Sequence, residues 1–314
     1  MSEKPDTVVL SVPTTELAED VRALLDPTLP IEVIEWDGGQ DPAPREVIDI
    51  VVPPYMKQGK ALKALEHVRH RLVQGQSIGF EGVADRLPEG SVYANASSVH
   101  ETATAELTLA LILAAQRELP RMIRNQDKGV WDSYRAAGLA DKRVLLLGFG
   151  GVSKAIADRL LPFEVDLVPV ATTARREAGI DVHAIDELPQ LLSTADILVI
   201  GLPGGDETRH LVDDAALSAL PDGALVVNVG RGSIVDTDAL VDHVSRGRIR
   251  VASDVFDPEP LPQDHPLWSL PGVIVAPHVG GNADPMRPRI ARLVAAQAER
   301  IARGEQPVNV VIGG

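Results

Sequence analysis

Four short segments in the second half of the chain carry residue types suited to phosphate binding and to acid–base chemistry. In chain order they are GFGGVS at 148–153, NVGRGSIVD at 228–236, DVFDPEPLP at 254–262 and APHVGG at 276–281. The first is a glycine turn of the kind that surrounds phosphate groups. The other three each contribute one polar residue, namely Arg231, Glu259 and His278. Each segment alone is a weak signal, whereas the four in this order indicate a catalytic site.

Arg231, Glu259 and His278 together suit chemistry on a carbonyl that lies beside a carboxylate. Arginine is always protonated and presents several donors in a fixed fork, so Arg231 can bind the carboxylate and polarise the carbonyl oxygen. Histidine is the usual proton donor near neutral pH, so His278 would protonate the alkoxide that forms when a hydride arrives. A neighbouring carboxylate stabilises imidazolium, so Glu259 would raise the pKa of His278 and fix its tautomer.

The glycine turn has the sequence context of a dinucleotide-binding motif. An apolar run at 144–147 reads as a buried strand, and the residues from Val152 onward have helical spacing. Gly148 would allow the tight turn, and Gly150 would let the backbone approach a pyrophosphate bound at the helix N-terminus. That helix opens with Gly151, Val152 and Ser153. Serine stands where the motif has its third glycine, and it is small enough for close packing of helix and strand.

The residues after the next predicted strand, VDLVPV at 165–170, bear on which cofactor binds. The motif expects a carboxylate there for the ribose 2′-hydroxyl, but the chain has Ala171. Two hydroxyls and two arginines follow, namely Thr172, Thr173, Arg175 and Arg176. Because a guanidinium matches phosphate geometry, this region predicts NADP in preference to NAD. The alternative is that the two arginines are a solvated pair in a loop.

At these motifs the chain resembles the D-isomer-specific 2-hydroxyacid dehydrogenases. The resemblance covers nearly the whole chain: NVGRGSIVD resembles the arginine loop of the family, and the stretch from ASDVF to APHVGG resembles its glutamate- and histidine-bearing segment. ETATAELTLALILAAQRELP at 101–120 resembles the helix that links the two domains of the family, and VQGQSIGFEGV at 73–83 its substrate-carboxylate loop. The departures are Ser153, the missing ribose carboxylate, and Ile-Gly-Phe-Glu at 78–81 in place of Ala-Gly-Val-Asp.

The resemblance implies roles for further residues. It implies the catalytic set Arg231, Glu259 and His278, and substrate contacts from Ile78 and Gly79 as well as from Arg231 and His278. Its implied cofactor contacts outside the glycine turn are Thr104, Pro203, Thr208, Val229, Gly230, Asp254 and Gly280. It also implies a homodimer that pairs through the region of helix 101–119, with Trp131 or Tyr134 near the active site of the neighbouring subunit.

Composition limits the classes of protein that the chain can belong to. Its 314 residues favour two domains, and a net charge of −15 without a basic run argues against nucleic acid or an anionic membrane as partner. The chain has no cysteine and no cluster of residues with metal-ligand spacing, so no metal site is expected. The N-terminus lacks the apolar segment of a signal peptide, and the apolar run at 107–115 is too short to span a bilayer. A cytoplasmic location is the expectation.

The order of predicted elements indicates an α/β protein with two domains. Residues 1–98 alternate short strands and helices, and an amphipathic helix at 288–304 with a last strand at 308–311 would return to them. Residues 1–98 and 285–314 are therefore expected to form a discontinuous, flavodoxin-like substrate domain. Residues 99–284, with a helix at 101–119 and six parallel strands, are expected to form a doubly wound (Rossmann) dinucleotide-binding domain.

These inferences predict an oxidoreductase that interconverts a 2-keto acid, such as glyoxylate or hydroxypyruvate, and its D-2-hydroxy acid with NADP preferred. Two alternatives stay open at this point. One is an NAD(P)-sensing binding protein like the corepressors that share the scaffold of the family. The other keeps hydride transfer but changes the donor to phosphite or formate, since the same arginine would hold either oxyanion.

Overall fold

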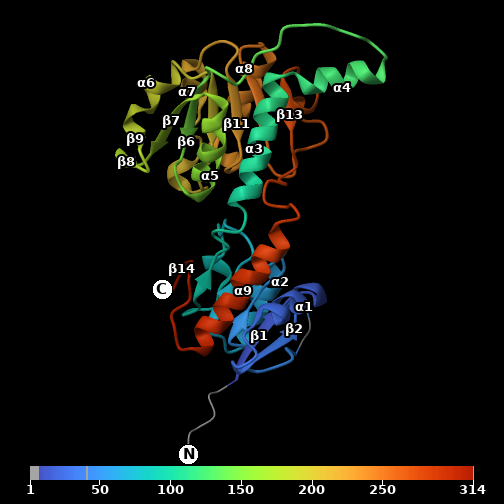
Figure 1. Cartoon of the computed structure of the whole chain (residues 1–314), viewed down its shortest axis with the longest axis vertical. Coiled ribbons are helices and arrows are strands. Elements are labelled where there is room, and N and C mark those ends of the chain that lie inside the picture. Colours follow the sequence, from blue (N-terminus) through green and yellow to red (C-terminus); the bar gives the residue numbers. More distant parts are fainter. Residues whose placement is uncertain (1–6, 40–41, 314) are drawn as a thin grey trace, which may run out of the picture. The chain divides into compact units, whose positions relative to one another are not determined.

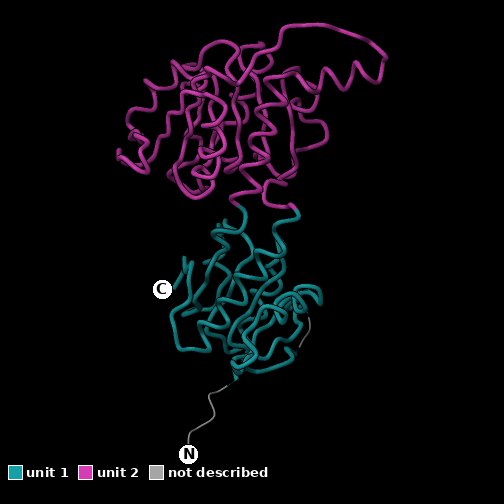
Figure 2. The backbone as a smooth tube through the Cα atoms, viewed as in Figure 1, with its two compact units in different colours: residues 1–100, 284–314 teal, residues 101–283 magenta. Residues whose placement is uncertain are grey.

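The computed structural model of the chain describes residues 7–39 and 42–313. The chain folds into two compact units (Figure 2). Unit 1 comprises Met1–His100 and Asp284–Gly314, and unit 2 comprises Glu101–Ala283. The chain thus passes into unit 2 two residues later than the sequence predicts, and leaves it one residue earlier.

Unit 1 is built on a six-stranded sheet in the order β14-β5-β4-β3-β1-β2. Its strands are β1 (Val8–Val12), β2 (Ile31–Glu35), β3 (Ile50–Val51), β4 (Leu72–Gln74), β5 (Tyr93–Ala94) and β14 (Val310–Ile312). Strands β1 to β5 pair in parallel in the spatial order 2-1-3-4-5, and β14 pairs with β5 antiparallel. This is the flavodoxin-like arrangement, so the fold predicted for this part of the chain is confirmed.

Helices cover both faces of this sheet. Helices α1 (Thr15–Leu24) and α9 (Met286–Ala302) share one apolar cluster with the sheet, and α2 (Gly59–Ala64) belongs to a second cluster. Ile50 of β3 lies in the first cluster and its neighbour Val51 in the second. Successive side chains of a strand point to opposite faces, so the two clusters form the two layers of the core.

Unit 2 is built on an eight-stranded sheet in the order β13-β12-β11-β10-β6-β7-β9-β8. Its strands are β6 (Arg143–Leu147), β7 (Asp166–Ala171), β8 (Arg175–Glu177), β9 (Ile180–Ala184), β10 (Ile197–Ile200), β11 (Leu225–Asn228), β12 (Arg250–Ser253) and β13 (Val273–Val275). All pairings are parallel except the one between β8 and β9. The strand order reverses between β6 and β10, which is the switch point of a Rossmann fold, and this fold is confirmed.

The helices of unit 2 also form two layers. Helices α3 (Glu101–Gln116) and α5 (Gly151–Leu160) pack on one face, while α6 (Leu188–Leu192), α7 (Asp214–Ala219) and α8 (Thr237–Ser245) pack on the other (Figure 1). Because the strands are parallel, the loops that follow β6, β10, β11, β12 and β13 all emerge at one edge of the sheet. The four motifs singled out in the sequence lie in these loops.

Three predictions about elements of unit 2 need correction. The helix expected at 101–119 ends at Gln116, because Glu118 has a left-handed backbone with φ of 54°, and a separate helix α4 (Leu119–Asp127) follows. The sheet has β8 and β9 in addition to the six expected strands. Arg175 and Arg176 therefore lie in a strand of a hairpin and not in a loop. In the described part of the chain, no helix is long and apolar enough to cross a membrane.

Candidate active site

The glycine turn follows β6 at the switch point of the sheet. Gly148 has φ of +99°, a conformation that favours glycine, and a Cβ there would lie 3.1 Å from the backbone of Gly201 at the end of β10. Ser153 is fully buried and its hydroxyl donates to the carbonyl of Gly201 at 3.4 Å. A small residue is therefore needed at position 153, as the sequence predicts, and serine satisfies this.

The N-terminus of α5 fits the pyrophosphate of a dinucleotide. Gly150 is its N-cap and no side chain caps the helix. A Cβ at Gly150 would meet nothing within 4 Å, so the space in front of the first turn is open. The N–H groups of Gly151, Val152 and Ser153 open this helix, and such groups bind phosphate oxygens with the help of the helix dipole.

Arg231 lies between two glycines that the packing requires. A Cβ at Gly230 would be 2.5 Å from the carbonyl oxygen of Leu202, and one at Gly232 would overlap the carbonyl of Phe256. The buried side chain of Asn228 supports this loop from both ends. Its Oδ1 accepts from Gly230 N at 3.0 Å, and its Nδ2 donates to the carbonyl of Arg231 at 2.9 Å. The backbone that carries Arg231 is thus fixed on both sides.

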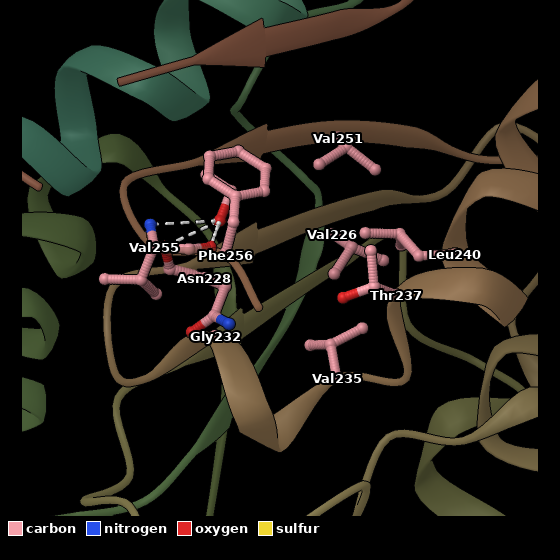
Figure 3. A pocket seen from close by; sticks show the side chains of 10 residues that line it. Val226, Asn228, Gly232, Val235, Thr237, Leu240, Val251, Val255 and Phe256 are labelled. Carbon is pink, nitrogen blue, oxygen red and sulfur yellow. Dashed lines mark hydrogen bonds between the residues drawn. The ribbon is translucent and has the colours of Figure 1, made fainter. Parts of the chain in front are cut away.

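The loop that carries Glu259 is attached to the Arg231 loop. Besides the close approach of Gly232 to Phe256, the hydroxyl of Thr237 donates to the carbonyl of Asp257 at 2.7 Å. Figure 3 shows Gly232, Phe256 and Thr237 around a small pocket that residues of both loops line. Oε1 of Glu259 accepts from Phe256 N at 3.1 Å, which leaves Oε2 for another partner.

The loop that carries His278 is held by Asp254. The backbone N–H of His278 donates to the carbonyl of Asp254 at 2.8 Å, and the carboxylate of Asp254 accepts from Val279 N and Gly280 N, both at 2.8 Å. Asp254 is 3% exposed, and this burial raises the pKa of its carboxyl. His278 itself has φ of 54°, so these bonds hold it in a left-handed conformation that few residues adopt.

The two loops bring Glu259 and His278 together as a dyad. Nδ1 of His278 lies 2.9 Å from Oε2 of Glu259. The hydrogen bond to Glu259 raises the pKa of His278 against the opposing effect of burial. Burial would raise the pKa of Glu259, but the hydrogen bond and the charge of His278 outweigh it, so this pKa is lowered. The structure thus supports an imidazolium–carboxylate pair that titrates as one unit.

The charge of Arg231 reaches this dyad. It lowers the pKa of both His278 and Glu259, although it is the smallest of the causes for each. The guanidinium of Arg231 also donates from Nη1 to the carbonyl of Gly230 at 2.8 Å. The structure therefore places the three residues predicted to be catalytic on three neighbouring loops of unit 2, within electrostatic range of one another.

Several predicted cofactor residues lie around the same edge of the sheet. Thr104 of α3 is nearly buried, and its Cγ2 is 3.4 Å from the place of a Cβ at Gly280. Val229 and Gly230 begin the loop after β11, and Thr208 donates its hydroxyl to the carbonyl of Pro203 at 3.0 Å. Thr172 and Thr173 are exposed beyond the end of β7. No group of three or more His, Cys, Asp or Glu that could hold a metal gathers within residues 7–39 and 42–313.

Arg175 and Arg176 have different surroundings, although the sequence treats them as a pair. Arg175 donates from Nη2 to the carbonyl of Phe149, inside the glycine turn, at 3.4 Å. Arg176 pairs instead with Asp181 across the hairpin at 3.2 Å, and its side chain is 70% exposed. Arg175 therefore contacts the glycine turn, whereas Arg176 is paired within its own hairpin.

Ile78 and Gly79 belong to unit 1, in the loop after β4. Asn95 donates from Nδ2 to the carbonyl of Ile78 at 2.8 Å, so this loop has a defined backbone anchor. Both residues are half-buried.

Sequence reasoning missed the residues that support the catalytic loops. The side chains of Asn228 and Thr237 donate hydrogen bonds to backbone carbonyls of other residues, which lie 3 and 20 positions away in the sequence. Asn228 was visible as the first residue of the motif NVGRGSIVD, at the end of an apolar strand. Such a place favours a polar residue that bonds the following loop, and this signal could have identified it.

Comparison with known proteins assigns the chain to a family. The model of the D-isomer specific 2-hydroxyacid dehydrogenase NAD-binding domain matches residues 109–280, which is more than half of the chain. The chain therefore belongs to the D-isomer-specific 2-hydroxyacid dehydrogenases, which are NAD(P)-dependent oxidoreductases, as its motifs predict.

Individual relatives agree with this assignment. Glyoxylate reductase of Aeropyrum pernix is 35% identical over 258 residues, covering 77% of this chain and 76% of that protein. D-3-phosphoglycerate dehydrogenase of Methanocaldococcus jannaschii is 31% identical, but the match spans only 43% of its length.

Solved structures give the same fold over 98% of the chain. A D-isomer specific 2-hydroxyacid dehydrogenase from Xanthobacter autotrophicus, in complex with NADPH and MES, has a TM-score of 0.80 and 27% identity over 98% of its length. An NADPH-dependent glyoxylate/hydroxypyruvate reductase from Sinorhizobium meliloti, in complex with NADP and malonate, has a TM-score of 0.78 and 25% identity over 97% of its length.

Proposed function

We propose that this enzyme reduces a small 2-keto acid, such as glyoxylate or hydroxypyruvate, to its D-2-hydroxy acid and that it prefers NADPH as cofactor. The observation that carries the proposal is the hydrogen bond of 2.9 Å between His278 and Glu259, within electrostatic range of Arg231. The choice of substrates is supported by the relatives, which are glyoxylate and glyoxylate/hydroxypyruvate reductases.

In this proposal each residue of the site has one task. When bound, the cofactor would supply the hydride that reduces the keto carbon. Arg231 binds the substrate carboxylate and polarises the carbonyl oxygen, because its guanidinium offers donors in a fixed fork. Nδ1 of His278 is engaged by Glu259, so Nε2 carries the proton that passes to the alkoxide oxygen. Ile78 and Gly79 of unit 1 are the further substrate contacts that the family resemblance implies.

The cofactor site in this proposal uses the glycine turn and the loops beside it. The open first turn of α5 would hold the pyrophosphate, and Thr104, Pro203, Thr208, Val229, Gly230, Asp254 and Gly280 would contact the rest of the dinucleotide. Ala171 at the end of β7 gives a ribose 2′-hydroxyl no carboxylate acceptor, and it gives a 2′-phosphate no repelling charge. Thr172, Thr173 and Arg175 offer donors near this point, which favours NADPH.

We further propose that the enzyme is a homodimer. The sequence predicts pairing through the region of helix 101–119, and we propose that α4 and the segment after it, which follow this helix directly, form the interface. Figure 1 shows α4 projecting from the body of unit 2. Ile123 of α4 is 61% exposed and Trp131 is 97% exposed, which is unusual for large apolar side chains. Tyr134 folds back on its own chain, because its hydroxyl donates to the carbonyl of Arg117 at 3.1 Å. Trp131 is therefore the better candidate to reach the neighbouring subunit.

A panel of 2-keto acids tested with NADPH and with NADH checks the proposed reaction. We expect turnover of glyoxylate or hydroxypyruvate, with kcat/KM for NADPH at least about tenfold above that for NADH. The matched control is His278→Ala, which should bind NADPH as the unaltered enzyme does. Absence of turnover with every keto acid, together with oxidation of phosphite or formate, would overturn the proposed substrate class.

Light scattering tests the proposed dimer. A stable monomer at micromolar concentration would contradict it.

A further inference from the structure

The hairpin of β8 and β9 separates the side chains of β8 onto two faces. Ala178 and Gly179 have φ of 50° and 84°, the positive values that a tight two-residue hairpin turn requires. Arg176 lies opposite Asp181 in the register, and the two side chains form an ion pair. Arg175 and Glu177, two residues apart, share the other face, so Arg175 and Arg176 point to opposite sides of the hairpin.

The face with Arg175 and Glu177 is turned toward the glycine turn. Arg175 lies opposite Val182, which is 3% exposed and belongs to the apolar cluster under α3 and α5. The guanidinium of Arg175 donates from Nε to Glu177 at 2.9 Å and from Nη2 to the carbonyl of Phe149 at 3.4 Å. The side chain of Arg175 therefore reaches from the hairpin to Phe149, which lies between Gly148 and Gly150 in the glycine turn.

A second cation, Lys154 of α5, meets the same carboxylate. Its ammonium group forms an ion pair with Oε1 of Glu177, while Arg175 holds Oε2. Lys154 is the fourth residue of α5, and its Nζ lies 5.9 Å from the centre of the Phe149 ring. The guanidinium carbon of Arg175 lies at the same distance from this ring, 5.9 Å. Two cations from two elements thus converge beside the glycine turn.

We propose that Lys154 and Arg175, bridged by Glu177, form the anion site that recognises a phosphate on the adenosine ribose, and that Arg176 takes no part. This inference rests on the proposed preference for NADPH and names the second cation of that site. Two cations and one carboxylate leave a net charge of +1. Glu177 stays ionised, because the hydrogen bonds from Lys154 and Arg175 lower its pKa.

Both cations have donors to spare for a phosphate. Arg175 has five N–H groups and uses Nε for Glu177, and its two longer bonds, from Nη1 to Thr173 and from Nη2 to Phe149, are both 3.4 Å. An ammonium has three donors, of which Glu177 engages Lys154 through one ion pair. Glu177 would therefore keep the two cations adjacent and leave their outer donors for phosphate oxygens.

The exposure of these side chains makes the site testable without loss of the fold. Lys154, Glu177 and Arg175 are 45%, 33% and 37% exposed, and exposed ion pairs contribute little to stability. Substitution of one cation should leave the melting temperature unchanged. Arg176 is the matched control, because it is an arginine of the same strand with a carboxylate partner of its own.

The experiment measures binding of two adenosine nucleotides by isothermal titration calorimetry, without any keto acid. The probes are adenosine 2′,5′-bisphosphate and adenosine 5′-monophosphate, and the variants are Lys154→Gln, Arg175→Gln and Arg176→Gln. We expect the unaltered protein to bind the bisphosphate at least about tenfold more tightly. Lys154→Gln and Arg175→Gln should each weaken bisphosphate binding by about fivefold or more and leave monophosphate binding within about twofold. Arg176→Gln should change neither affinity by more than about twofold.

Each outcome decides between the proposals. If Lys154→Gln keeps the full preference for the bisphosphate, or if Arg176→Gln loses as much as Lys154→Gln, the assigned site is wrong while the preference for NADPH stands. If the unaltered protein binds both nucleotides equally, the preference for NADPH is wrong and this site falls with it. Turnover of keto acids is not involved in any of these measurements.

Discussion

The loops that carry Arg231, Glu259 and His278 and the hairpin that carries Arg175 lie in opposite halves of one sheet and are held by different forces. The catalytic loops touch backbone to backbone at Gly230 and Gly232, and buried Asn228 and Asp254 bond their main chains. Strand β9 of the hairpin is anchored by its pairing with β7 and by the buried side chain of Val182. The side chains of β8, by contrast, are held by ion pairs whose members are about one third to three quarters exposed.

This contrast separates two kinds of adaptability within one enzyme. A residue whose backbone packs against another buried backbone has no room for a larger side chain. The catalytic loops therefore tolerate few substitutions at these contacts. An exposed ion pair can be replaced at small cost in stability, so the choice of cofactor can change while the fold stays the same. Four substitutions test this difference, from the largest expected effect to the smallest.

His278→Ala should abolish most of the activity and leave the fold intact. Removal of a general acid lowers turnover by about 100-fold or more. The variant should bind NADPH normally, because the backbone bonds from residues 278–280 to Asp254 do not use the imidazole. Steady-state kinetics and NADPH fluorescence titration measure the two effects. Turnover near that of the unaltered enzyme would remove His278 from the mechanism.

Gly232→Ala should damage both stability and activity. The new methyl group would overlap the carbonyl of Phe256, so the Arg231 loop and the Glu259 loop must separate. Such overpacking costs about 1–3 kcal/mol, visible as a lower melting temperature. Gly138→Ala is the control, because a Cβ there meets nothing within 4 Å. Equal melting temperatures of the two variants would show that these loops are not in rigid contact.

Glu259→Gln should shift the pH dependence of reduction to more acidic values. Reduction requires protonated His278, and the bond to Glu259 raises the pKa of this histidine. Without the carboxylate the pKa falls, so the loss of activity that accompanies rising pH should begin at lower pH. The pH profile of kcat/KM for the keto acid measures this shift. An unchanged or alkaline-shifted profile would contradict the dyad.

Asp181→Asn should have the smallest effect. It removes the partner of Arg176, on the face of β8 that points away from the glycine turn. The melting temperature should equal that of the unaltered enzyme within error. The ratio of kcat/KM for NADPH to that for NADH should stay within about twofold. A marked change in cofactor preference would show that the two faces of the hairpin are coupled.

The catalytic loops could be predicted from the sequence because each is a short, contiguous motif after an apolar strand. Gly148 and Gly150, and Arg231 between its two glycines, have local physical requirements that a reader of the sequence can recognise. The fold class of both units also followed from the alternation of strands and helices, although strands β8 and β9 of unit 2 were not expected.

The hairpin could not be predicted in the same way. Its turn is Ala178-Gly179, and alanine rarely takes the positive φ that the first position needs, so no turn motif marks it. Its strand β8 consists of Arg-Arg-Glu, without apolar alternation, and the contact between Lys154 and Glu177 joins residues 23 positions apart. Contacts of this kind depend on how two elements meet in space, which a single sequence does not encode locally.

The composition of β8 has a consequence for how the molecule behaves in a crowded solution. β8 is the last strand of its sheet, and one side of its backbone is therefore open to pairing with another chain. All three of its residues are charged, and their side chains are engaged in ion pairs. Charged side chains on an edge strand disfavour pairing with a strand of another molecule, because pairing would bury these charges. The charged residues of β8 that we propose to set the cofactor preference thus also disfavour edge-to-edge aggregation.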